Sequence, residues 1–198
     1  MYGCSTLPSG TLNVNGTVFD IAGANGGNNA WFSSAAANNG PGTVNVTIPI
    51  NLKGATTVYT LMNTFWGQTV GSYDTVTFTG SSGTTYSVDL YGDKDIRDYN
   101  AADWTNSVSG NTQQAWTNST DSQRLDMQTF VLPSDFADQT LVSMTITDNA
   151  STVYSRIFLA GLTVDPADPV TVPEPAPLAL VGGVLIAAGI FFRRRRAV

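Results

Sequence analysis

The sequence predicts a mainly β protein, an antiparallel β-sandwich followed by a single C-terminal transmembrane helix. Nine short stretches rich in apolar and β-branched residues precede residue 165, separated by Gly, Asn and Ser turns and without helical periodicity. An uncharged apolar run then fills residues 176–192. We therefore divide the chain into a sandwich domain (1–164), a linker with Pro and Asp (165–172) and a C-terminal segment (172–198).

The individual strands follow from side-chain alternation and from turn residues. Residues 44–53 alternate between apolar and polar side chains, which predicts a half-buried strand. Pro49 lies within it and cannot donate to a ladder, so we expect an edge or a bulge there. Asn15-Gly16 predicts a hairpin turn between Thr11–Val14 and Thr17–Ile21. The other predicted strands are Thr57–Asn63, Thr75–Thr79, Thr85–Leu90, Leu125–Leu132, Leu141–Thr147 and Val153–Val164. We expect a long polar segment at 91–121.

The apolar run from Ala176 to Phe192 has the length of a short membrane span. Its seventeen residues would form a helix of roughly 25 Å, against a hydrocarbon core of about 30 Å. Its Leu, Ile, Val and Phe side chains together favour insertion by roughly 4 kcal/mol. A buried core helix of this length is the alternative, but four consecutive arginines, Arg193, Arg194, Arg195 and Arg196, follow directly. They favour a cytoplasmic end that contacts anionic membrane lipid.

The same segment resembles the PEP-CTERM sorting signal of Gram-negative bacteria. The motif Pro173-Glu174-Pro175, preceded by Val172, is followed by the apolar run and the arginines in the order of that signal. The resemblance covers about an eighth of the chain. It implies export and cleavage near the motif by an exosortase, a membrane-embedded cysteine protease. We expect an export signal upstream of Met1, because Met1-Tyr2-Gly3 cannot act as one.

Charge and composition restrict the partners and the chemistry of the domain. Residues 1–170 carry five basic residues and fourteen aspartates, a net charge of −9, which disfavours nucleic acid. The chain has no histidine and one cysteine, so common nucleophilic and zinc sites lack their residues. Two aspartates could serve a glycosidase, but we expect no enzyme, no cofactor and no metal. Asp93, Asp95 and Asp98 could hold calcium, although a solvated loop with Arg97 paired to a neighbouring aspartate is favoured.

A second, looser resemblance covers about forty residues of the domain. The stretches Val58–Thr64, Phe65-Trp66-Gly67, Thr75–Phe78, Tyr86–Leu90 and Asp95–Tyr99 occur in an order similar to galactose-binding-like modules of carbohydrate-active enzymes. This resemblance implies a jelly-roll-like sandwich and a sugar ligand. The candidate ligand-binding residues are Trp66, Asp95, Arg97, Asp98, Trp104 and Trp116. For Trp66 a core position is favoured over sugar stacking, whereas Trp104 and Trp116 stay open between the two.

These features predict an exported, non-catalytic envelope or extracellular-matrix protein. The precursor would sit in the inner membrane with its domain outside the cytoplasm, and the processed form would reach the cell surface or matrix. The expected partners are an exosortase and membrane lipid. A carbohydrate-binding module that attaches to exopolysaccharide is the alternative.

Overall fold

The computed structural model describes residues 7–23, 29–33, 42–67, 72–101, 107–120, 122–149 and 155–167, with only the backbone at Tyr73. The chain divides into two compact units, Met1–Ala167 and Asp168–Val198, and all of these residues lie in the first. The predicted span 176–192, the motif 172–175, Arg193–Arg196 and Trp104 lie outside the described residues. In the part of the chain that is described, no helix has the length and apolar content needed to span a bilayer.

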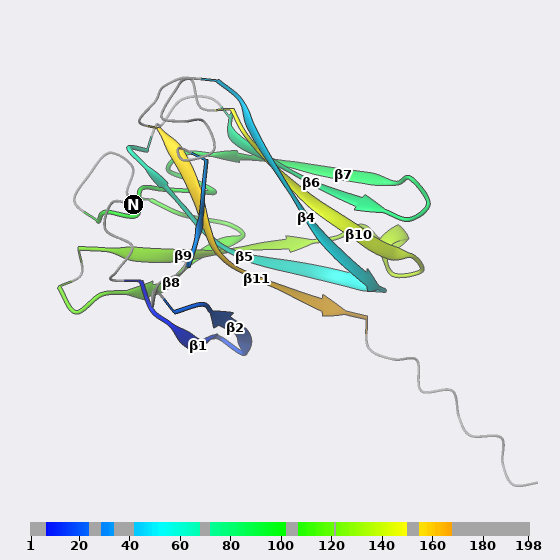
Figure 1. The fold of residues 1–198 in the computed structure, drawn as a ribbon, viewed down its shortest axis with the longest axis horizontal. Coiled ribbons are helices and arrows are strands. Elements are labelled where there is room, and N and C mark those ends of the chain that lie inside the picture. Colours follow the sequence, from blue (N-terminus) through cyan, green and yellow to red (C-terminus); the bar gives the residue numbers. More distant parts are fainter. Residues whose placement is uncertain are drawn as a thin grey trace, which may run out of the picture. The chain divides into compact units, whose positions relative to one another are not determined.

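The described part is mainly β, and its strands pair antiparallel (Figure 1). β1 and β2 form a hairpin, β4-β10-β6-β7 form a four-stranded sheet, and β3-β11-β5-β9-β8 form a five-stranded sheet. A short 3-10 helix, η2 (Ser134–Phe136), connects β9 to β10. The strands are β1 (Gly10–Val14), β2 (Thr17–Ile21), β3 (Trp31–Phe32), β4 (Val44–Lys53), β5 (Ala55–Phe65), β6 (Ser72–Gly80), β7 (Thr85–Tyr91), β8 (Thr112–Thr117), β9 (Arg124–Val131), β10 (Thr140–Asp148) and β11 (Arg156–Pro166).

The strand pairs are nested within one another along the chain. β3 pairs with β11, β4 with β10, β5 with β9, and β6 with β7. Two further pairs, β11 with β5 and β10 with β6, join these into the two larger sheets. The consecutive strands β4 and β5 therefore lie in different sheets, as do β5 and β6.

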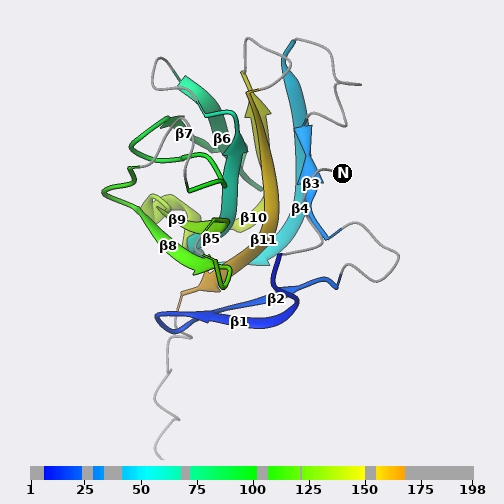
Figure 2. The same cartoon turned by 90° about the vertical axis from the view of Figure 1, so that its left-hand side faces the viewer.

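Two apolar cores hold the layers together. The first lies between the two large sheets and combines residues such as Met62 of β5 and Ile157 of β11 with Phe78 of β6 and Met144 of β10. The second lies on the other face of the five-stranded sheet, where the β1–β2 hairpin covers it (Figures 1 and 2). This arrangement is sandwich-like, with an additional hairpin on one outer face.

Each predicted strand overlaps an observed one. The Asn15-Gly16 hairpin is confirmed, and both residues have the positive φ (51° and 98°) that a tight primed turn requires. β4 is an edge strand, and its register with β10 shifts between Leu141 and Ser143, opposite the stretch that contains Pro49. The expectations for Pro49 are thus confirmed.

The structure also departs from the predicted boundaries. β3 and β8 were not predicted, because β3 is two residues long and β8 lies within a polar sequence. β11 continues to Pro166, since Asp165 pairs with Thr57 and Pro166 with Ala55. The strand therefore extends two residues into the segment predicted as a linker.

Candidate functional site

The predicted site residues Arg97 and Asp98 lie where β5 and β9 separate. The pairing of these strands ends at Leu61 and Met127. Beyond that point, residues 97–100, which we call the wedge segment, lie between the strands. The backbone N–H of Thr64 donates to Arg97 O at 3.0 Å, and the N–H of Arg124 donates to Tyr99 O at 2.9 Å. The wedge segment thus replaces the direct hydrogen bonds between β5 and β9.

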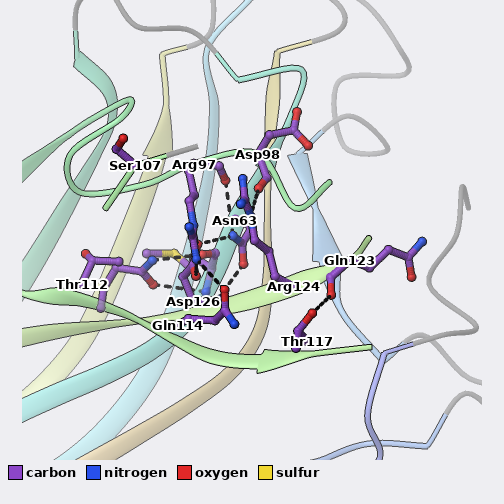
Figure 3. Close-up of polar contacts among 12 residues, drawn as sticks. Asn63, Arg97, Asp98, Ser107, Thr112, Gln114, Thr117, Gln123, Arg124 and Asp126 are labelled. Atoms are coloured by element: carbon purple, nitrogen blue, oxygen red, sulfur yellow. Dashed lines mark hydrogen bonds and ion pairs between the residues drawn. The ribbon is translucent and has the colours of Figure 1, made fainter. Parts of the chain in front are cut away.

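A buried ion pair fixes the wedge segment to β9 (Figure 3). Nε and Nη2 of Arg97 donate to the two carboxylate oxygens of Asp126 at 2.8 and 2.7 Å. Asp126 is fully buried and Arg97 is 8% exposed. Such two-pronged pairing is the strong form of a carboxylate–guanidinium contact. Gln114 of β8 accepts a further bond from Nη2 of Arg97 at 3.0 Å.

Two amide side chains satisfy the backbone groups that the separated strands leave open. Nδ2 of Asn63 donates to Asp126 Oδ2 at 2.6 Å, and Asn63 Oδ1 accepts from the backbone N–H of Asp126 at 2.9 Å. The side chain of Gln128 binds two backbone groups of Met62: it accepts from the N–H and donates to the carbonyl. The side chains of Asn63, Asp126 and Gln128 are all buried, so these hydrogen bonds offset the cost of removing the polar groups from water.

Asp98 and Arg124 complete the network at the outer end of the wedge segment. The carboxylate of Asp98 accepts from the backbone N–H groups of Gly67 at 3.0 Å and Asn100 at 2.7 Å. Nε of Arg124 donates to the carbonyl of Asp98 at 2.9 Å. Burial, and then the positive charge of Arg97, lower the pKa of Arg124 from its usual value. Arg97, Asp98 and Arg124 therefore hold the backbone in place where β5 and β9 separate, a point that we call the fork.

The solvated loop favoured for this segment is wrong, because Arg97 and Asp98 are buried. Arg97 does pair with an aspartate, but this is Asp126 of β9, twenty-nine residues away along the chain. The prediction that an aspartate pairs with Arg97 is confirmed. Which aspartate does so depends on the strand that packs beside Arg97, and distance along the sequence does not indicate this. Asp95 is partly buried, and its carboxylate lies 3.5 Å from Lys94 Nζ. No group of three or more His, Cys, Asp or Glu among the described residues could hold a metal ion.

The aromatic candidates separate into three cases. Trp66 is 52% exposed with a φ of 54°, so the favoured core position is wrong. The left-handed backbone at the end of β5 directs this side chain outward, while Phe65 packs with the second core. Trp116 of β8 is half-buried against the second core. Trp104 lies outside the described residues.

Sequence reasoning missed a second buried polar cluster, formed by Asp74, Asp148 and Arg156. Asp74 of β6 and Asp148 of β10 are register partners, and both are fully buried. Arg156 Nη1 lies 3.4 Å from Asp148 Oδ2 and donates to the carbonyl of Gly42 at 2.8 Å. Burial, and then the charge of Asp148, raise the pKa of Asp74 well above its usual range.

The signal for this cluster was present in the strand alternation. Asp74 is in phase with Val76 and Phe78, and Asp148 is in phase with Met144 and Ile146, all of which point into the core. A carboxylate in the apolar phase of a strand predicts a buried charge.

The two clusters join strands and loops of the domain through buried polar contacts. The charged groups around the wedge segment are engaged with one another or with backbone. The chain matches no protein-family model and no curated protein.

Proposed function

We propose that the chain is an exported, non-catalytic envelope or extracellular-matrix protein, sorted and cleaved through its C-terminal segment. The observation that carries this proposal is the ordered set of Pro173-Glu174-Pro175, the apolar run 176–192 and Arg193–Arg196. Each part requires a different medium: water, hydrocarbon and an anionic membrane surface. Its similarity to the PEP-CTERM signal makes an exosortase the proposed processing enzyme.

The division of the chain supports this topology. All described strands and both cores lie in the unit that ends at Ala167, six residues before Pro173. A domain that closes its own core before the motif can fold outside the membrane while the tail is anchored. The proposed location is thus the inner membrane for the precursor and the cell surface or matrix for the product.

We further propose that the sandwich is a jelly roll. The nested pairs β3–β11, β4–β10, β5–β9 and β6–β7 support it, because folding one long antiparallel hairpin onto itself generates such pairs. The contacts of β11 with β5 and β10 with β6 are those that close the roll. β8 is then an additional edge strand, and the β1–β2 hairpin an additional cover.

Attachment to polysaccharide is the second candidate function. The exposed side chain of Trp66 favours it, because an apolar ring on the surface can stack on a sugar. Its neighbour Gly67 is fixed by the hydrogen bond from its N–H to Asp98, which gives the aromatic a rigid base. Arg97 and Asp98 then support such a site without touching the ligand.

Processing of a Glu174→Ala variant tests the leading proposal. In a host that contains the exosortase, with an export signal supplied, the wild type should convert to a shorter form. The variant should accumulate at full length in the inner membrane, because the prolines keep the motif extended and Glu174 supplies its only charge. Gel mobility of fractionated membranes measures both forms.

The matched control is Asp168→Ala, which removes a carboxylate from the same stretch outside the motif. It should be processed like the wild type. Equal conversion of the Glu174→Ala and wild-type chains would mean that the motif is only a spacer. The chain would then be an ordinary single-span membrane protein.

A further inference from the structure

The outer face of the four-stranded sheet carries a regular array of small polar side chains. Three rows cross the four strands in the order β4, β10, β6, β7, and nine of the twelve residues carry a hydroxyl. The rows are Pro49–Ser143–Thr79–Thr85, Thr47–Thr145–Thr77–Ser87 and Asn45–Thr147–Thr75–Asp89. All twelve are exposed or half-buried, and we call this surface the hydroxyl face.

Hydrogen bonds between neighbouring strands hold parts of the hydroxyl face in fixed rotamers. Thr47 Oγ1 and Thr145 Oγ1 are 3.0 Å apart, and Thr77 Oγ1 and Ser87 Oγ are 2.9 Å apart. Thr75 Oγ1 donates to Asp89 Oδ1 at 2.7 Å. β-Branched threonines also have restricted χ1 angles. A ligand that binds here orders few side chains, so the entropic cost of binding is low.

The electrostatics of the hydroxyl face select against charged partners. Asp89 is its single charged residue, whereas about a quarter of the residues of an ordinary soluble domain are charged. Each hydroxyl offers one donor and two acceptor lone pairs, of which the contacts between strands use only part. The chemistry that such a surface matches is a neutral partner that also offers donors and acceptors at regular intervals.

We propose that the hydroxyl face binds a neutral, extended polysaccharide whose chain runs across the strands along a row. Neighbouring strands are about 4.8 Å apart, close to the length of one extended sugar residue, so successive sugars meet successive strands. The strands of a sheet rotate by roughly 20–25° from one to the next, which a flexible chain can follow and a planar crystal surface cannot. This proposal rests on the proposed export, since only an exported domain meets exopolysaccharide.

Affinity electrophoresis of the full-length chain in non-ionic detergent tests this proposal. The probe is hydroxyethyl cellulose, a soluble neutral β-1,4-glucan, cast into a native gel, with alginate as the anionic comparison. The wild type should be retarded by the glucan and not by alginate. Thr77→Val with Thr145→Val removes two central hydroxyls but keeps the β-branched shape, and should weaken retention about tenfold. Thr77→Ser with Thr145→Ser should restore it.

The control is Thr57→Val with Thr129→Val, the same change on the five-stranded sheet, which should be retarded like the wild type. Three results would each overturn the proposal. The first is that the glucan does not retard the wild type, and the second is that it retards the Thr77→Val, Thr145→Val variant as strongly as the wild type. The third is that alginate retards the wild type as strongly as the glucan does. Any of them leaves the processing of Glu174 variants unaffected, so failure here is distinct from failure of the sorting proposal.

Discussion

The ion pair between Arg97 and Asp126 should dominate the stability of the fork between β5 and β9. Asp126→Asn keeps the shape of the side chain but removes the charge that three short hydrogen bonds address, two from Arg97 and one from Asn63. The buried guanidinium then loses the carboxylate to which its Nε and Nη2 donate. Removing one member of a buried pair costs about 3–5 kcal/mol. For a domain of this size that lowers Tm by about 6–20 °C.

Urea unfolding of residues 1–167, followed by tryptophan fluorescence, measures the loss. The matched control is Asp135→Asn, which removes an exposed carboxylate and should change the free energy of unfolding by less than about 0.5 kcal/mol. Arg97→Met combined with Asp126→Leu removes both charges and should cost less than the two single changes together. A loss below about 1 kcal/mol for Asp126→Asn would refute the reasoning, because the pair would then contribute no more than an exposed one.

Two further predictions concern the same domain. Folding raises the pKa of Asp74, so the contribution of Asp74 to stability is most favourable below the unfolded pKa of about 4 and becomes less favourable as pH rises towards the folded value. Asp74→Asn should therefore match the wild type near pH 3 and exceed it by about 1–3 kcal/mol at pH 7 in urea titrations. Equal pH profiles would contradict this, and the exposed Asp135→Asn is the control. Residues 1–167 alone should also give a β-type circular dichroism spectrum, whereas a spectrum dominated by helix would contradict the fold.

The strands could be predicted where apolar and polar side chains alternate without interruption. β4 alternates over ten residues, and the hairpin turn has the two residues that its dihedral angles require. β8 could not be predicted in this way, because its sequence is mostly polar and does not alternate, and pairing with β9 stabilises the strand. Similarly, Asp165 and Pro166 resemble a linker and become strand only because β5 is adjacent. Tertiary pairing overrides local propensity at both places.

The candidate site was less predictable than the strands. The sequence indicated that residues 95–99 were charged and followed a strand, but the partners of Arg97 lie on β5, β8 and β9. These contacts depend on where β5 and β9 separate, which no local pattern determines. Trp66 was misjudged for a related reason: its direction is set by a single left-handed residue conformation rather than by its apolar character.

The distribution of charge links the fold to the proposed partner. All three arginines of residues 1–167 are buried, where they hold the wedge segment and the Asp74 cluster. Among the described residues, the positive side chains outside the interior are Lys53 and Lys94, against seven aspartates. The surface is therefore strongly acidic, although the hydroxyl face itself is almost uncharged. Repulsion of anionic polymers over most of the domain, with one neutral surface, favours a neutral polysaccharide over an acidic one.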